Sequence, residues 1–195
     1  RSKKNAVILA HYYQTGDIQD IADHIGDSLE LARRARMTDA QIIVLAGVKF
    51  MAETAKILSP QKKVLIPDTE AGCSLADSCK PEEFKKFIND NPGRTVVTYV
   101  NTTAEIKALS DIICTSSNAL KIIESLPPGE KIIFAPDRNL GNYIKSKTTR
   151  DIIVWEGTCH VHEAFSLEGI IKLKEEFQSA KIIVHPECEL PVRMV

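Results

Sequence analysis

The feature of this sequence that most constrains its fold is a long internal repeat. Three apolar runs each end in two polar residues that lie two positions apart, and these pairs are His11 and Tyr13, Tyr99 and Asn101, and His185 and Glu187. The first and second pairs are 88 residues apart, and the second and third pairs are 86 residues apart. Residues two apart on a strand point to the same side. The spacing therefore predicts a repeated unit whose first strands end in matching polar side chains.

Short apolar runs alternate with helical patterns along the chain. Runs such as 41–46, 95–100 and 131–135 are typical of buried parallel strands. The alternation predicts an α/β protein built from repeated three-layer α/β/α domains, each with a small parallel sheet and helices on both faces.

The repeat also predicts where the domains divide. We expect a first repeat at 1–79, a second at 80–163, and an incomplete third at 164–195 that begins a strand at 181–184. In a pseudo-threefold arrangement the polar strand ends would face one cavity, because ligands in such sheets bind at the carboxyl ends of the strands.

Two helical patterns follow the first strands of the first two units. Their apolar positions are Ile18, Ile21, Ala22 and Ile25 in the first unit, and Ile106, Leu109, Ile112 and Ile113 in the second. Each pattern is then broken, and Ser28 and Ser116 stand where another helix is expected to begin. A serine there caps the helix, and with free backbone N–H groups its hydroxyl also suits a carboxylate or phosphate.

Composition excludes some classes of function. The formal net charge of −1 gives no reason to expect a nucleic acid or an anionic membrane as partner. No apolar run approaches the length of a membrane span, and no secretory signal pattern is present. Five widely spaced cysteines without a signal peptide favour a reducing, cytoplasmic location, where cysteines are more often core, metal or catalytic residues than disulfides.

Cys73 and Cys159 are the candidate metal ligands. They lie 86 residues apart, in equivalent turns of two units. Iron–sulfur clusters and zinc both use thiolates gathered from separate turns. A third ligand is expected about 86 residues beyond Cys159, outside this chain. Cys114 is expected in the core, and Cys79 and Cys188 have no counterpart in the other unit.

Other side chains leave alternatives open. Cys159, His160 and His162 could hold zinc in a lyase or hydrolase, but we favour His162 as part of the cavity wall and His160 as structural. A non-enzymatic iron–sulfur sensor is the second alternative, and it would need a partner surface or DNA-binding element that the sequence does not contain. Tyr13 and Glu187 could act as acid and base if both face the cavity.

With these residues assembled, the chain resembles the quinolinate synthase (quinolinate synthetase A) family. The resemblance rests on motifs spread over essentially the whole chain: 8–14 (ILAHYYQ), 26–29 (GDSL), 48–53 (VKFMAE), 72–77 (GCSLAD), 99–102 (YVNT), 114–116 (CTS), 136–141 (PDRNLG), 157–162 (GTCHVH) and 185–188 (HPEC). It implies a pseudo-threefold assembly of three α/β/α domains, each giving one cysteine to a [4Fe-4S] cluster. The enzymes of this family condense iminoaspartate with dihydroxyacetone phosphate to quinolinate, with loss of phosphate and water, in de novo NAD biosynthesis.

The resemblance also assigns roles to residues of this chain. Cys73 and Cys159 would be two of the three cluster ligands, and Tyr13 and Glu187 would move protons. The residues expected to bind substrate are His11, Ser28, Tyr99, Asn101, Ser116, His162 and His185. L-aspartate oxidase would be the upstream enzyme. Most of the third domain is missing, so a C-terminally truncated chain is implied, inactive alone and unable to hold a stable cluster.

Overall fold

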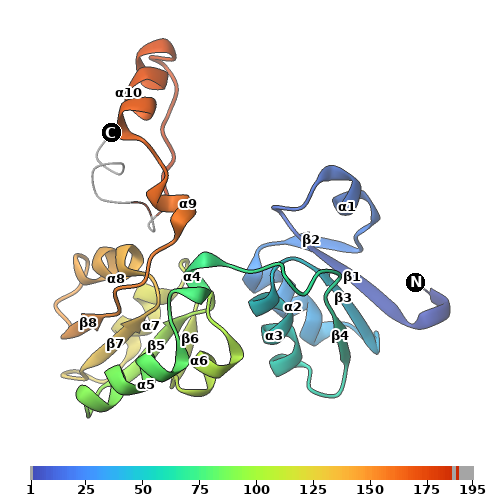
Figure 1. Cartoon of the computed structure of the whole chain (residues 1–195), viewed down its shortest axis with the longest axis horizontal. Coiled ribbons are helices and arrows are strands. Elements are labelled where there is room, and N and C mark those ends of the chain that lie inside the picture. Colours follow the sequence, from blue (N-terminus) through green and yellow to red (C-terminus); the bar gives the residue numbers. More distant parts are fainter. Residues whose placement is uncertain (1, 186–187, 189–195) are drawn as a thin grey trace.

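The structure is a computed structural model that describes residues 2–185 and 188. It contains two four-stranded parallel sheets, one in each repeat (Figure 1). The first has the order β2-β1-β3-β4, with β1 (Ala6–His11), β2 (His24–Gly26), β3 (Ile42–Ala46) and β4 (Lys63–Leu65). The second has the order β6-β5-β7-β8, with β5 (Thr95–Tyr99), β6 (Ile112–Cys114), β7 (Ile132–Ala135) and β8 (Ile152–Val154). The identical order confirms the predicted repeated α/β fold.

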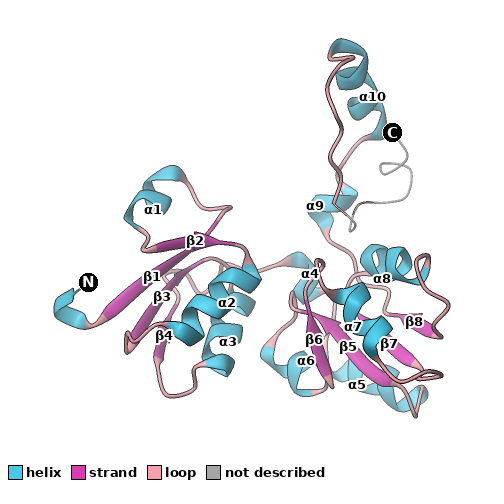
Figure 2. Cartoon of the chain, turned by 180° about the vertical axis from the view of Figure 1, so that it is seen from behind, coloured by secondary structure: helices cyan, strands magenta, loops and turns pink. Residues whose placement is uncertain are grey.

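Helices connect the strands in the same sequence in both repeats. The first repeat has η1 (Ser2–Lys4), α1 (Gly16–Ile21), α2 (Ser28–Met37) and α3 (Lys49–Leu58). The remaining helices are α4 (Ser74–Asp77), α5 (Pro81–Asp90), α6 (Ala104–Ala108), α7 (Ala119–Ser125), α8 (Arg138–Lys145), α9 (His160–Glu163) and α10 (Leu167–Glu176). Figure 2 shows helices on both sides of the second sheet. No helix of the described residues is both long and apolar enough to cross a membrane.

The two faces of the second sheet have separate cores. On one face, Phe84 of α5 and Ile106 of α6 cluster with Val96 of β5. On the other, helices α7 and α8 pack against Val97, which points the opposite way because side chains alternate along a strand. This second cluster continues into the first repeat, where it includes Leu9 and Ile43. The two repeats therefore share one continuous hydrophobic core.

The two helices predicted from Ile18 to Ile25 and from Ile106 to Ile113 are wrong in their second halves. Helices α1 and α6 end early, and the strands β2 and β6 follow at the sheet edges. Each edge strand is preceded by an aspartate that accepts from the backbone of the central strand. Asp23 Oδ2 accepts from Ile8 N and Asp111 Oδ2 accepts from Val96 N, both at 2.8 Å. These long-range hydrogen bonds override a weak helical pattern.

The serines predicted to cap helices do not do so. Asp27 is the N-cap of α2, where its Oδ1 accepts from Glu30 N at 2.8 Å, and Ser28 is the first helical residue. In the second repeat α7 begins at Ala119, so that Ser116 lies in the preceding turn. The expectation that these serines act as N-caps is therefore corrected.

The segment after the second repeat extends away from the rest of the chain (Figure 1). Helix α10 has no buried residue. The strand predicted at 181–184 is wrong, since residues 181–185 have no regular secondary structure. A strand needs a hydrogen-bonding neighbour, and none of the described strands lies beside this segment. The domain limits 1–79, 80–163 and 164–195 and the pseudo-threefold arrangement stay predictions.

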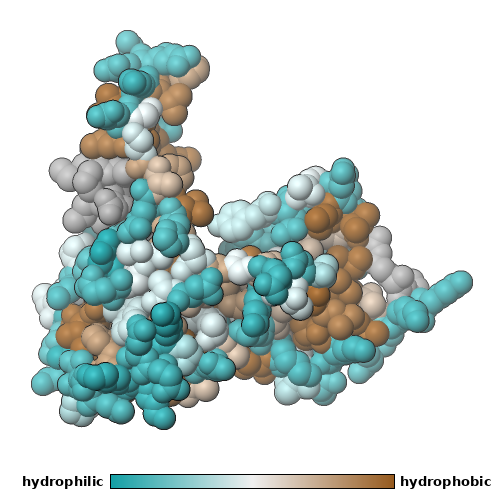
Figure 3. All heavy atoms as spheres, in the orientation of Figure 1, coloured by the Kyte–Doolittle hydropathy of each residue, from teal (hydrophilic) through white to brown (hydrophobic). Residues whose placement is uncertain are grey.

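Hydrophobic side chains gather on the surface over the sheet of the first repeat (Figure 3). Ile25 of β2 and Leu65 of β4, the two edge strands of this sheet, are exposed.

Candidate functional site

A cavity of about 180 Å³ lies between the two repeats at the carboxyl ends of β1 and β5. This is where parallel sheets place their ligands. Seven residues chosen from the sequence line it together: His11, Tyr13, Ser28, Tyr99, Asn101, Ser116 and His185. Asp27, Leu29, Met51, Val100, Thr115 and Ser117 complete its wall. Strand ends from both repeats therefore converge on one small polar site.

His11 ends β1 and is buried, with 5% of its surface exposed. Its Nδ1 accepts a hydrogen bond from the backbone N–H of Tyr13 at 3.2 Å. Burial lowers the pKa of His11, and the nearby negative charge of Asp27 partly opposes this. A neutral imidazole that accepts at Nδ1 carries its proton on Nε2. His11 can therefore donate one hydrogen bond from Nε2 to a ligand oxygen.

The matched positions Tyr13 and Tyr99 differ in exposure. The Tyr13 ring lies 4.2 Å from that of His11 between centroids, and Tyr13 is 86% exposed. Tyr99 ends β5 and is buried. Its carbonyl accepts from the hydroxyl of Thr102 at 3.2 Å, which tightens the turn that carries Asn101. Tyr99 of the second repeat therefore forms a buried part of the cavity wall, and Tyr13 of the first repeat lies at the solvent-exposed side.

The chain returns to the cavity through His185. Its Nε2 lies 3.4 Å from the hydroxyl of Ser116, and its ring stacks on that of His162, 5.7 Å away and tilted by 10°. His162 does not line the cavity itself but supports a ring that does. Glu187, the predicted proton-transfer partner of Tyr13, lies outside the described residues.

Cys73 and Cys159 occupy equivalent places in the structure. Each precedes a four-residue helix, α4 or α9, at its N-cap position. Burial raises the pKa of the Cys73 thiol, while backbone N–H groups of Ala76 and Leu75 oppose the rise and the neighbouring Cys159 adds to it.

Gly157 holds the Cys159 turn against the first cysteine's turn. A Cβ at Gly157 would lie 2.4 Å from the carbonyl oxygen of Pro136 and 2.5 Å from Ser78 Oγ. Trp155 Nε1 also donates to the carbonyl of Ser78, at 3.2 Å. Only glycine permits this close approach. The sequence analysis did not assign this role to Gly157, although a glycine two residues before the candidate ligand Cys159 could have indicated it.

The PDRN motif supports the same turn. Asp137 is fully buried and caps α8, its Oδ1 accepting from Leu140 N at 2.5 Å. Arg138 N donates to the carbonyl of Gly157 at 2.8 Å, and its guanidinium lies 3.4 Å from Glu163 of α9. The motif therefore fixes both ends of the segment that contains Cys159.

The two thiols fit part of a cluster site. They come from two turns that a hydrogen bond between His160 and Ser74 joins, and backbone N–H groups of Ala76 and Leu75 favour the thiolate form of Cys73, which is the form that iron–sulfur clusters use. Within residues 2–185 and 188, no three His, Cys, Asp or Glu side chains form a group that could hold a metal ion. The described residues thus supply two candidate thiols and no third side chain beside them.

The zinc alternative finds no support in this geometry. His160 is exposed, and His162 stacks on His185 rather than joining Cys159. The other cysteines are buried, as a core role requires. Burial raises the pKa values of Cys79 and Cys114 to about 12, so both remain thiols at neutral pH.

A family model described as quinolinate synthetase A protein matches residues 1–195. The chain belongs to the quinolinate synthetase A family. It is 62% identical over 189 residues to the quinolinate synthase of Synechocystis sp., covering 97% of this chain and 59% of that protein. Quinolinate synthases of Chloroherpeton thalassium and Rippkaea orientalis are 60% identical over 189 residues and 64% identical over 185 residues. These matches cover 97% and 95% of this chain, and 59% and 57% of the relatives, so the chain spans less than two thirds of the length of these curated relatives.

Proposed function

We propose that this chain supplies two of three repeats of a quinolinate synthase. The reaction condenses iminoaspartate with dihydroxyacetone phosphate and releases phosphate and water. The observation that carries this proposal is the cavity between the repeats, which is lined by residues at matched strand ends of both. The family match agrees with it. L-aspartate oxidase would supply the unstable imine, and the cytoplasm is the proposed location.

The cavity wall suits a small anionic substrate. His11 can donate from Nε2, and Ser28, Asn101 and Ser116 bring two hydroxyls and an amide. Asp27 is the one carboxylate among the described lining residues, and it is occupied as the cap of α2. The imidazole, the two hydroxyls and the amide can each turn a donor toward a carboxylate or phosphate oxygen.

The remaining steps need proton transfer and an electrophile. Tyr13, next to His11 at the open side, and Glu187 are the proposed proton carriers. Cys73 and Cys159 would hold a [4Fe-4S] cluster with a third thiol from outside this chain. When bound, the cluster supplies a Lewis acid that polarises a substrate oxygen. The protein orients the substrates and keeps water from the reacting atoms.

A chimera tests the activity. The matching 189 residues of the Synechocystis relative are replaced by this chain, and quinolinate formation is measured under anaerobic conditions. We expect activity within about tenfold of the relative, because the exchanged segments are 62% identical. The same chimera with Cys73→Ser should be inactive. A folded chimera that binds iron and sulfide but forms no quinolinate would contradict the proposal.

A further inference from the structure

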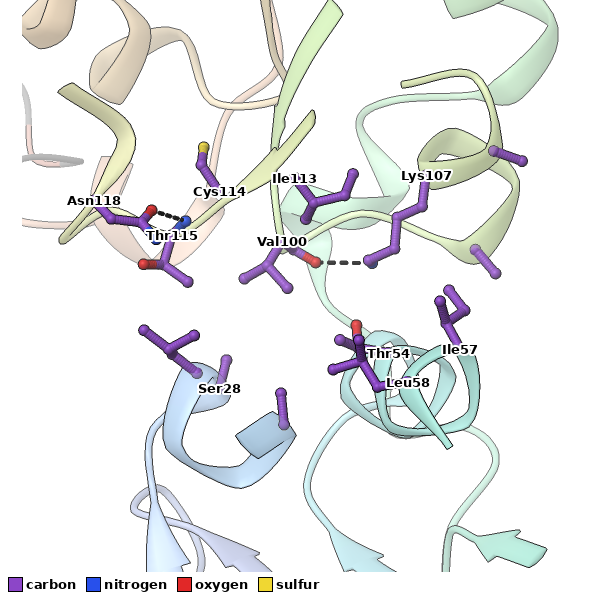
Figure 4. A pocket seen from close by; sticks show the side chains of 14 residues that line it. Ser28, Thr54, Ile57, Leu58, Val100, Lys107, Ile113, Cys114, Thr115 and Asn118 are labelled. Carbon is purple, nitrogen blue, oxygen red and sulfur yellow. Dashed lines mark hydrogen bonds between the residues drawn. The ribbon is translucent and has the colours of Figure 1, made fainter. Parts of the chain in front are cut away.

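Lys107 is a buried cation at the junction of the two repeats. It lies on α6 with 9% of its surface exposed, beside a cavity of about 500 Å³ between α2 and α3 on one side and β6 and α6 on the other (Figure 4). The cavity wall near it is mostly apolar and includes Ile57 and Leu58 of α3. A buried ammonium group in such surroundings is costly unless it is hydrogen-bonded.

The partners of Lys107 belong to the turn that follows β5. Its Nζ donates to the carbonyl of Val100 at 2.9 Å and also to the carbonyl of Thr102. These two carbonyls flank Asn101, a residue of the candidate site. The backbone N–H of Thr102 donates to the carbonyl of Val100 at 2.8 Å, so the turn closes around the ammonium group.

The first repeat contributes to the same arrangement. The ring centroid of Phe50 in α3 lies 5.5 Å from Lys107 Nζ, within the range of a cation–π interaction. Glu53, one turn further along α3, accepts from the backbone N–H of Ala104 at 2.8 Å. Burial lowers the pKa of Lys107 to about 8, and the negative charge of Glu53 opposes this shift. The anchor of the turn therefore depends on how the repeats dock.

We propose that Lys107 is a positioning residue, whose ammonium group holds the carbonyls of Val100 and Thr102 and thereby fixes Tyr99 and Asn101 in the site. The effect of Lys107 on substrate affinity rests on the proposed function. Its effect on the conformation of the turn at 100–102 does not depend on what the site binds. Because Phe50 and Glu53 act on the same ammonium group, the first repeat helps to set the site residues of the second.

Lys62 provides a matched control. It is 5% exposed, and its Nζ donates to the carbonyl of Ala35 at 3.0 Å and to that of Thr38, at the end of α2. It is thus another buried lysine that binds backbone carbonyls, but both of these carbonyls belong to the first repeat, and Lys62 is not among the residues that line the candidate site. Replacing either lysine by methionine removes the ammonium group while keeping an unbranched side chain that is one heavy atom shorter.

The experiment compares the unmodified chain with Lys107→Met, Lys107→Arg and Lys62→Met. Amide hydrogen exchange is measured at residues 100–102. Binding of phthalate, an aromatic dicarboxylate that serves as the small anionic probe, is measured by titration calorimetry.

We expect Lys107→Met to lower the protection factors of these amides about tenfold and the phthalate affinity about tenfold, which is the size of one lost charge-assisted hydrogen bond. Lys107→Arg should recover part of both, because it restores a cation with several donors. Lys62→Met should change neither.

The outcomes separate the two claims. If exchange at 100–102 is unchanged in Lys107→Met, or changes equally in Lys62→Met, the positioning role is wrong. If the unmodified chain binds no phthalate, the proposed site fails for this chain, and the exchange comparison still decides the role of Lys107.

A pH series on the unmodified chain replaces Lys107→Met if that variant does not fold. Protection at 100–102 should fall between pH 7 and pH 9.5, as Lys107 loses its proton with a pKa of about 8. The groups that face Lys107 are Glu53 of α3, the Cys114 thiol, which stays protonated in this range, and Ser28, Leu29 and Ala32 of α2, which do not titrate. Unchanged protection over this range would overturn the proposal.

Discussion

The backbone N–H of His160 donates a hydrogen bond to the hydroxyl of Ser74 at 3.3 Å. Each of these residues directly follows one of the two matched cysteines, so the bond joins equivalent turns of the two repeats. It fixes the relative position of Cys73 and Cys159 without any bound group.

Removing that hydroxyl should loosen the pair of cysteines. We expect Ser74→Ala to lower the free energy of unfolding by about 1 kcal/mol, the typical net value of one hydrogen bond. The reaction of Cys73 and Cys159 with a thiol reagent should become faster. Ser166→Ala is the control, because its hydroxyl also accepts a backbone N–H, from Gly169 at 3.2 Å, but lies outside the cysteine turns. Equal thiol reactivity in both variants would count against the linking role of Ser74.

The turn that carries Cys159 should not tolerate a side chain at position 157. Gly157→Ala places a Cβ against the backbone oxygen of Pro136, which has no flexible way to move aside. We expect a loss of about 2–3 kcal/mol in urea-induced unfolding. Gly16→Ala is the control, since its Cβ would meet no atom within 4 Å and should change stability by less than about 1 kcal/mol. Equal stability of the two variants would refute the close approach.

His11 should make stability depend on mildly acidic pH. Its folded pKa lies below the unfolded value of 6.5, so the unfolded chain takes up a proton first as pH falls. The chain should therefore lose stability below pH 6.5, down to the folded pKa. In His11→Gln this contribution is absent, so the variant's stability should fall less steeply in the same range. Parallel curves from pH 7 to pH 5 would mean that His11 titrates normally.

Cys79 should reduce stability at alkaline pH. Its folded pKa is raised to about 12 from 9.0, so above pH 9 the unfolded chain releases a proton that the folded chain retains. Compared with Cys79→Ala, the unmodified chain should lose about 1.4 kcal/mol per pH unit above pH 9. Chemical unfolding at pH 8, 9 and 10 measures this difference. A constant difference would show that the thiol titrates in the folded chain.

Reconstitution should show an incomplete cluster site. After anaerobic treatment with iron and sulfide and removal of unbound ions, we expect this chain to retain fewer than four irons, because two thiols do not complete a cluster. Cys73→Ser and Cys159→Ser should each lower the retained iron further, and Cys114→Ser, at a buried core position, should not. Four irons and four sulfides per chain would contradict this expectation.

The strand ends could be predicted because their signal is local and repeated. His11 and Tyr99 each end a buried apolar run, and the same spacing recurs in the next unit. The edge strands β2 and β6 could not, since three residues carry too little pattern. Their formation depends on Asp23 and Asp111, whose hydrogen bonds reach 15 residues back along the chain.

Part of the candidate site also lay beyond the sequence pattern. The sequence pattern gives no sign that Lys107 is buried, but in the structure it is 9% exposed and lies beside Phe50 of α3. Asp27 and Ser28 are adjacent, and both residue types are common N-caps. Which of them caps α2 depends on whether the helix begins at residue 28 or at residue 29. The burial of Lys107 and the start of α2 depend on tertiary packing, which cannot be deduced from a single sequence.

The identical strand order of the two sheets has a consequence for how such a site can originate. When a cavity lies where equivalent units meet, no single unit has to contain the whole cavity. Separate copies of one short chain could therefore have formed it as a symmetric oligomer. All copies would then have presented the same pair of side chains. Joining the copies in one gene frees each unit to diverge, and here one presents His11 and Tyr13 where the other presents Tyr99 and Asn101. Fusion thereby lets a symmetric scaffold recognise molecules whose two ends differ.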